Sequence, residues 1–164
     1  MFTGIVQSKS KEKKIIKKNF GAELSINVEN GFTNNLKKGD SIAVNGVCLT
    51  VCSFTKKNIK FEIIHESLRL TNLIKNSSMP LNLERSLKIG DEIGGHLVSG
   101  HIHGMGKVEE FKKGKEKILT ISKPAAIKEY IFKKGYVAIN GISLTVSSSS
   151  KKNFSVSLIP ETIE

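Results

Sequence analysis

Two short stretches of the chain carry small hydroxyl and thiol side chains at alternate positions, a pattern that can bind a polar ligand. The first is GDSIAVNGVCLTV (residues 39–51) and the second is GYVAINGISLTV (residues 135–146). Alternate side chains of a strand point to opposite faces, so each stretch predicts one aliphatic face and one polar face. The polar faces carry Cys48, Thr50 and Cys52 in the first copy and Ser143, Thr145 and Ser147 in the second. Such a face either lines a ligand site or meets solvent, and the pattern alone leaves both interpretations open.

The two stretches are copies at a fixed offset. Their Asn-Gly pairs begin at Asn45 and Asn140, 95 residues apart, and the same offset relates IHES (residues 64–67) to IPET (residues 159–162). A repeat of this length indicates two domain-sized units rather than a solenoid. We therefore expect a tandem duplication, with domains at residues 1–95 and residues 96–164.

A glycine-dense segment joins the two units and carries three of the four histidines. It is GDEIGGHLVSGHIHGMG (residues 90–106), with His96, His101 and His103. Histidine titrates near neutral pH and can transfer protons. His101 and His103 are two residues apart and could face one side of a strand, as zinc ligands often do. No third ligand stands at a suitable spacing, so no metal is expected, and an ordinary loop role for His101 remains an alternative.

The turn and strand signals indicate an all-β protein. Asn-Gly favours a tight hairpin turn, which predicts strands at residues 41–44 and 47–54 around Asn45. Further short strands and turns between them favour β-barrels. The other strands are predicted at residues 2–7, 22–28, 58–64, 81–83, 107–111, 118–122 and 153–159, with short helices at residues 68–73 and 125–131. The second unit has no counterpart of strand 81–83, so we expect it to be one strand short, with an exposed edge.

Composition narrows the possible partners. The net charge is +11, from 26 Lys and Arg against 15 Asp and Glu, which suits an anionic surface unless the lysines simply cover solvated loops. There is no Trp and there are only two Tyr, so stacking on bases is poorly supplied and no nucleic-acid partner is expected. No apolar run approaches the ~20 residues of a membrane span. The N-terminus lacks a signal-peptide pattern, which favours a cytoplasmic protein.

The two cysteines are expected to be free thiols. Cys48 and Cys52 are four residues apart on one predicted strand, which separates them by ~13 Å. A disulfide needs Cα atoms within ~7 Å. Free thiols are typical of a reducing compartment.

Several segments together resemble the riboflavin synthase family, and the resemblance covers the whole chain. They are MFTGIV (residues 1–6), the two repeated stretches, ESLRLTNL (residues 66–73), GGHLVSGH (residues 94–101) and IPET (residues 159–162). The resemblance implies two similar six-stranded antiparallel Greek-key barrels in tandem, the second incomplete here, with short helices. It further implies that each barrel binds one lumazine and that a C-terminal helix holds three subunits together as a homotrimer.

The resemblance also implies a reaction that needs no cofactor. Two molecules of 6,7-dimethyl-8-ribityllumazine exchange a four-carbon unit and become riboflavin and 5-amino-6-(ribitylamino)uracil, the last step of riboflavin biosynthesis. Members place this transferase site between the N-terminal barrel of one subunit and the C-terminal barrel of its neighbour. The alternative is a non-catalytic lumazine- or flavin-binding protein of the same superfamily, which binds ligand only in the N-terminal barrel. Intact His101, Ser143 and Thr145 favour the enzyme.

Site residues follow from the same resemblance, position by position. The N-barrel substrate site is expected at Gly4, Ile5, Val6, Cys48, Leu49, Thr50, Glu62, Ile63, Ile64, His65, Glu66 and Ser67. The C-barrel site is expected at Gly100, His101, Ile102, Lys134, Ser143, Leu144, Thr145, Leu158, Ile159, Pro160, Glu161, Thr162 and Ile163.

Five positions are expected to carry the chemistry. Phe2, Cys48 and His101 match positions tied to activity, and His101 is the expected proton acceptor from the 7-methyl group. Ser143 or Thr145 would add to the ring or orient a water that does so. Cys48 as a small core residue and Lys134 as a solvated lysine remain alternatives.

The chain departs from the family pattern at three places. His103 is an imidazole where none is expected, and Asn140 stands where some members have Asp. The family also continues beyond the position of Glu164 with a strand, an acidic residue that helps bind the ribityl chain, and the trimer helix. These departures leave trimer formation and completion of the C-barrel site open.

Overall fold

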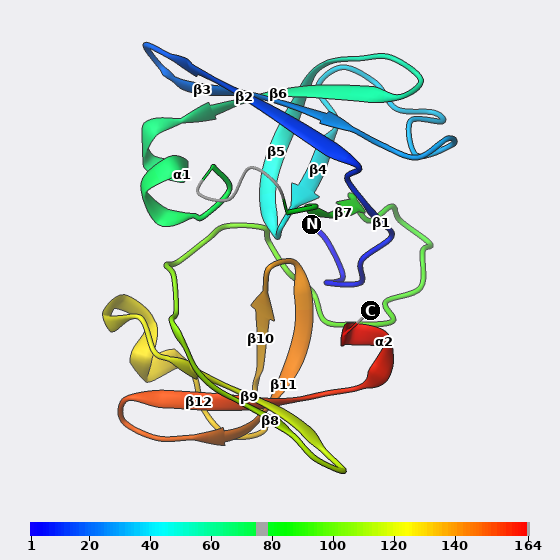
Figure 1. Ribbon diagram of the computed structural model, residues 1–164. Helices are drawn as coiled ribbons and strands as arrows, with labels where there is room; N and C mark the ends of the chain where they lie inside the picture. Colours follow the sequence, from blue (N-terminus) through cyan, green and yellow to red (C-terminus); the bar gives the residue numbers. More distant parts are fainter. Residues whose placement is uncertain (75–78, 164) are drawn as a thin grey trace.

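The computed structural model describes residues 1–74 and 79–163 and contains two antiparallel β units stacked end to end (Figure 1). The first unit is a seven-stranded sheet in the order β1-β7-β4-β5-β6-β3-β2. The second is a five-stranded sheet in the order β10-β11-β12-β9-β8. The all-β fold with short helices expected from the sequence is confirmed. The boundary at residues 95 and 96 stays a prediction.

The first unit closes into a barrel because its two edge strands are consecutive in the chain. Its elements are β1 (Ser8–Lys9), β2 (Glu12–Lys18), β3 (Gly21–Asn27), β4 (Ser41–Val44), β5 (Val47–Phe54), β6 (Asn58–Ile64), α1 (His65–Leu70) and β7 (Asn82–Arg85). Between β1 and β2, the Ser10 N–H donates to Leu81 O and the Lys11 N–H donates to Asn27 O, so the chain passes directly from one sheet edge to the other. With β1 and β2 counted as one bent strand, the barrel has six strands.

The second unit repeats this pattern but stays open. Its elements are β8 (Val108–Lys113), β9 (Lys117–Ser122), the 3₁₀ helix η1 (Ala125–Tyr130), β10 (Tyr136–Ile139), β11 (Ile142–Ser149), β12 (Asn153–Leu158) and α2 (Pro160–Ile163). In the first unit β4 pairs with β7, whereas its counterpart β10 pairs, within the described residues, with β11 alone. As expected, the described part of the second unit has one strand fewer than the first, and one edge of β10 has no neighbouring strand.

Both Asn-Gly hairpins form as predicted, with left-handed backbones at Asn45 (φ +46°) and Asn140 (φ +48°). In β5 the alternating Val47, Leu49 and Val51 are buried in the first core, as the pattern predicts. The prediction of a first strand at residues 2–7 is wrong, because Phe2 forms only an isolated bridge with Val98 and the first paired strand is β1. The expected helix at residues 68–73 lies earlier, as α1.

The two units meet through their Asn-Gly turns. A Cβ on Gly46 would lie 2.7 Å from the Gly141 nitrogen, and a Cβ on Gly141 would lie 2.8 Å from the Gly46 nitrogen, so the two turns are in direct backbone contact. The Asn82 side chain adds a hydrogen bond from its Nδ2 to Asn140 O at 3.0 Å. Figure 1 shows the N-terminus between the two units and α2 beside the second unit.

None of the helices in the described part of the chain is long and apolar enough to cross a membrane.

Candidate functional site

The segment that precedes the strands of each unit forms hydrogen bonds with a strand of the other unit. We define the first leading segment as residues 2–7 and the second as residues 98–103. The Ser143 N–H on β11 donates to Gly4 O at 2.9 Å, and the Cys48 N–H on β5 donates to Gly100 O at 2.9 Å. The two contacts are equivalent, since Cys48 and Ser143 occupy the same place in the two copies. The segments also pair with each other through Phe2 and Val98.

The contacts of these segments differ from the grouping that the resemblance implies. Gly4, which the resemblance groups with the N-barrel site, lies between the units: its oxygen accepts the Ser143 N–H of the second unit and its N–H donates to Glu84 of the first. Gly100, which the resemblance groups with the C-barrel site, lies against Cys48 of the first unit. The repeat order along the chain cannot reveal these contacts, because a segment that crosses to the other unit keeps its place in the sequence.

A cavity of about 990 Å³, here called the large cavity, lies between the first leading segment and the second unit. Of the expected site residues it is lined by Gly4, Ile5, Val6, Lys134, Ser143, Leu144, Thr145, Ile159, Glu161, Thr162 and Ile163. Its volume suits an organic ligand of moderate size. The predicted polar face of β11 therefore borders a cavity.

Three buried polar atoms of residues that line the large cavity have no hydrogen-bond partner among the described residues. They are Ser143 Oγ, His96 Nδ1 and Ser8 Oγ. Buried polar atoms are normally paired with protein or water, so these three are free to bond a ligand or water. The His96 ring stacks on Tyr136 with centroids 4.3 Å apart, and the Tyr136 hydroxyl donates to Leu97 O at 3.3 Å.

Lys134 lines the large cavity in an unusual backbone conformation. Its φ of +69° is in the left-handed region, which costs a residue with a Cβ roughly 1–2 kcal/mol. The corresponding residue of the first unit is Gly39, with φ +94° and the equivalent hydrogen bond from its N–H to Val51 O. A lysine in a glycine position beside a cavity is a strained residue of the kind that collects at functional sites.

A second cavity of about 650 Å³, here called the small cavity, lies beside the open edge of β10. It is lined by Gly100, His101, Ile102 and His103 together with Tyr130 and Tyr136. The His101 side chain is exposed, and the His101 N–H donates to Ser99 Oγ at 3.2 Å. Within one chain, His101 and Ser143 thus border different cavities.

The remaining expected site residues surround β5 and β6 of the first unit and line neither cavity. Phe2 is 1% exposed and packs with Cys48 against Gly100. Leu49 and Ile63 point into the core, so only their backbones are available to a ligand. Five of the others are exposed and one, Ser67, is half-buried; the exposed residues are Thr50, Glu62, Ile64, His65 and Glu66. The Nε2 of His65 lies 3.0 Å from Asn19 O.

In the second unit, Leu158 and Pro160 also lie outside the lining of both cavities, and Leu158 packs against the second core. Among the described residues, no group of three or more His, Cys, Asp or Glu side chains is placed to hold a metal ion.

Nine residues that line the large cavity are outside the site expected from the sequence: Gln7, Ser8, Lys9, Glu29, Asn82, His96, Ile142, Ser147 and Ser157. The signal that could have found His96 is its position in GGHLVSGH, the segment that also carries His101.

Comparison with known proteins gives the family. The lumazine binding domain model matches residues 3–86 and again residues 99–164. Riboflavin synthase of Buchnera aphidicola subsp. Schizaphis graminum is 43% identical over 99% of this chain and 80% of its own length. The riboflavin synthase of Escherichia coli strain K12 is 39% identical over 100% of this chain and 78% of its own length.

Solved structures give the same fold. A crystal structure of LumP complexed with riboflavin matches with a TM-score of 0.86 and 25% identity, over 96% of this chain and 86% of that one. A crystal structure of LumP complexed with 6,7-dimethyl-8-(1'-D-ribityl) lumazine matches with the same TM-score at 24% identity, over 99% of this chain and 88% of that one. With its two matched lumazine binding domains and its curated relatives, this chain belongs to the riboflavin synthase family.

Proposed function

We propose that this protein is a riboflavin synthase, which converts two molecules of 6,7-dimethyl-8-ribityllumazine into riboflavin and 5-amino-6-(ribitylamino)uracil. The observation that carries the proposal is the pair of lumazine binding domains, together with riboflavin synthases about 40% identical over nearly the whole chain. The two products contain all the atoms of the two substrates, so the exchange consumes no oxidant, reductant or cofactor.

The large cavity is the proposed site for one lumazine. Ser143 Oγ and His96 Nδ1 have free hydrogen-bonding capacity there, and Thr145, Ser147 and Thr162 add hydroxyl groups along the wall. Hydroxyl and backbone groups of this kind bind a ribityl chain and a pyrimidine ring by hydrogen bonds. Lys134 contributes a positive charge at the same wall.

The second lumazine is proposed to bind on the first unit, at the equivalent face around Cys48, Thr50 and Glu66, with Gly100 and His101 from the second leading segment. His101 is the proposed base for the 7-methyl group, and Ser143 the proposed group that adds to the ring or orients water. Holding two identical substrates face to face turns a bimolecular reaction into an oriented one.

We further propose that the two sites face each other across subunits of a homotrimer. The proposal is supported by His101 and Ser143, which border different cavities within one chain, so that a second copy would bring the two sites together. Ile64 and Ile159 hold equivalent positions at the end of β6 and just after β12, and they are 56% and 63% exposed. Exposed apolar side chains on both proposed site faces suit a head-to-tail contact that closes into a ring.

A cytoplasmic location is also proposed, because both cysteines are free thiols, which fits a reducing compartment. Absence of a nucleic-acid partner stays a prediction.

Absorbance tests the activity directly. Purified protein is incubated with 6,7-dimethyl-8-ribityllumazine, and growth of the riboflavin band is followed. His101→Ala should lower turnover about 100-fold or more if His101 is the base. His103→Ala shares the small cavity and should keep most of the turnover. A wild-type protein that forms no riboflavin would contradict the proposal.

Ser143→Ala tests the large cavity, with Ser148→Ala as its matched control on the same strand. Ser148 is exposed and does not line the cavity. Loss of a neutral hydrogen bond should weaken lumazine binding about fivefold in Ser143→Ala. The affinity of Ser148→Ala should be unchanged, and equal affinities of both variants with wild type would remove Ser143 from the site.

The fold shared with LumP supports a second candidate function, the binding of a flavin or lumazine without catalysis. Tight binding of one lumazine per chain with no riboflavin formed would favour it. The higher identity with the riboflavin synthases, 43% against 25%, favours the enzyme.

A further inference from the structure

One buried carboxylate of the first unit has no part in the site described so far. Glu84 on β7 is 4% exposed. Its Oε1 accepts hydrogen bonds from the Thr3 N–H at 2.6 Å and the Thr3 hydroxyl at 2.7 Å. Its Oε2 accepts a bond from the Gly4 N–H at 3.0 Å. All three donors are neutral groups of the first leading segment.

The burial of the Glu84 carboxylate must be compensated by its surroundings. Burial of a carboxylate is costly unless hydrogen bonds replace its water. Bonds from N–H and O–H groups to a carboxylate are stronger than bonds between neutral groups, and three of them converge on Glu84. The bonds therefore fix Thr3 and Gly4 firmly against the first barrel.

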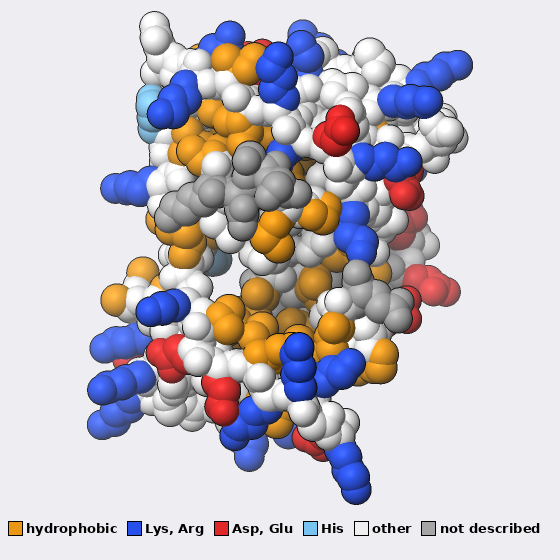
Figure 2. All heavy atoms as spheres, viewed as in Figure 1, with side chains coloured by type: hydrophobic (Ala, Val, Ile, Leu, Met, Phe, Trp, Pro, Cys, Tyr) orange, Lys and Arg blue, Asp and Glu red, His pale blue; other side chains and the backbone are white. Residues whose placement is uncertain are grey.

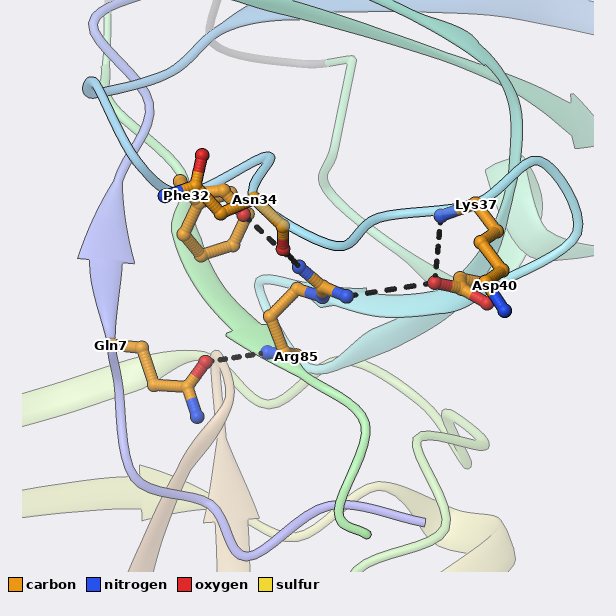
Figure 3. A network of polar contacts seen from close by, with 6 residues as sticks. All are labelled: Gln7, Phe32, Asn34, Lys37, Asp40 and Arg85. Atoms are coloured by element: carbon orange, nitrogen blue, oxygen red, sulfur yellow. Dashed lines mark hydrogen bonds and ion pairs between the residues drawn. The ribbon is translucent and has the colours of Figure 1, made fainter. Parts of the chain in front are cut away.

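Strand β7 also fixes the other end of the segment. The Gln7 N–H donates to Leu83 O at 2.9 Å, and the Arg85 N–H donates to Gln7 Oε1 at 2.8 Å. The Arg85 guanidinium is itself fixed by Phe32 O at 3.1 Å and Asn34 O at 3.2 Å, with Asp40 3.5 Å away (Figure 3). Between these two anchors, Ile5 and Val6 are left to form a wall of the large cavity.

On its other side the segment faces the second unit. Gly4 O accepts the Ser143 N–H, and Thr3 O accepts the His96 N–H at 2.9 Å. His96 and Ser143 are two of the three residues of the large cavity whose side chains carry unpaired buried polar atoms, the third being Ser8. The chain of contacts therefore runs from Glu84 through Thr3 and Gly4 to His96 and Ser143.

We infer that Glu84 is a positioning residue for the ligand site of the second unit, although it lies in the barrel of the first. Through Thr3 and Gly4 it sets the position of His96 and Ser143 relative to the ligand. The inference rests on the proposed lumazine site and predicts a loss confined to that site. The equivalent first-unit contact joins the Cys48 N–H to Gly100 O, whereas the three hydrogen bonds of the Glu84 carboxylate go to Thr3 and Gly4.

The substitution Glu84→Gln tests the inference with little change in shape. The Gln amide nitrogen faces either the Gly4 N–H or the Thr3 donors, so at least one bond becomes a contact between two donors. Thr3→Val is the milder second variant, which removes one donor and keeps the carboxylate. Glu92→Gln, an exposed carboxylate, is the control with the same change of charge.

The readout is the pair of backbone amides of Ser143 and Cys48, followed by ¹⁵N NMR during titration with 6,7-dimethyl-8-ribityllumazine. In Glu84→Gln the free-protein resonance of Ser143 should shift, while that of Cys48 should stay in place. The affinity reported by Ser143 should fall roughly tenfold, and that reported by Cys48 should change less than twofold. Thr3→Val should show a smaller loss at Ser143 alone, and Glu92→Gln none.

Unchanged affinity at Ser143, or an equal loss at both amides, would overturn the inference. If Glu84→Gln does not fold, Thr3→Val decides by the same two resonances. Wild-type protein that binds no lumazine would instead contradict the proposed function. Even then, the Ser143 shift in Glu84→Gln would test whether Glu84 anchors the segment.

Discussion

The two units are built from copies of one pattern, yet the first encloses its core and the second leaves its core half open. Among the described residues, the first core contains fifteen buried apolar side chains and the second contains five. The counterparts of buried Val47 and Leu49 are Ile142 and Leu144, which are only partly buried. The difference is β7, which pairs with β4 in the first unit and has no described counterpart beside β10.

The larger hydrophobic core and the large cavity lie in different units. The first unit holds most of the buried apolar surface, which is the main source of folding free energy. The second unit holds the large cavity and the strained Lys134. Figure 2 shows hydrophobic side chains gathered on the face of the second unit that borders the hollow between the units. Most of the buried apolar side chains and the large cavity therefore lie in different units.

The largest expected difference comes from one leucine that occurs in both copies. Leu24 is 0% exposed and faces Phe61, whereas its counterpart Leu119 is half-buried and faces Val156. Leu24→Ala should lower the free energy of unfolding by about 3 kcal/mol, and Leu119→Ala by about 1 kcal/mol, because less surface and a smaller cavity are involved. Urea denaturation measures both, and equal losses would show that the two cores contribute alike.

The contact between the Asn-Gly turns gives the next effect. Gly46→Ala places a Cβ against the Gly141 backbone in addition to its positive φ of +80°. The combined strain and overlap should cost about 3 kcal/mol. Gly39→Ala is the control, since its φ is +94° but its Cβ would meet nothing within 4 Å, and it should cost about 1 kcal/mol. Thermal unfolding compares the two, and a Gly46→Ala protein as stable as Gly39→Ala would mean that the units separate readily.

The smallest effect has the opposite sign. Lys134→Gly gives the second unit the glycine that the first has at Gly39. Relief of the left-handed strain, less the added flexibility of glycine, should raise the free energy of unfolding by about 0.5 kcal/mol. Lumazine affinity should fall at the same time, because Lys134 lines the large cavity. Chemical denaturation and a fluorescence titration test both halves, and a stabilised variant with full affinity would leave Lys134 without a role in binding.

Local rules predicted the repeated elements well. The Asn-Gly turns and the alternation of Val47, Leu49 and Val51 determined the hairpins and the buried face. Local rules failed for the first leading segment, because Phe2 and Gly4 make their hydrogen bonds with residues far away in the sequence. Alternation along a strand says which face a side chain is on, but not which unit covers that face.

Sequence patterns indicated a polar face on β11, but not the segments that lie beside it. The hydroxyls of Ser143 and Thr145 do border a cavity, as the pattern of polar alternation allowed. The roles of Glu84 and Asn82 could not be predicted, because a carboxylate or amide in a short strand gives no sign of the segment that it will bind. The contacts of Gly4 with Ser143 and of Gly100 with Cys48 join residues of different repeats, which local sequence patterns do not reveal.

The contact between Gly46 and Gly141 also bears on how the duplication can evolve. After a gene segment is doubled, the two copies are free to diverge wherever each is surrounded by its own neighbours. Here each glycine occupies the space that a side chain on the other would need. A side chain added in one copy would overlap the backbone of the other copy, so the two turns must change together or stay the same. This feature, which both repeats share, is thus constrained by the packing of one repeat against the other.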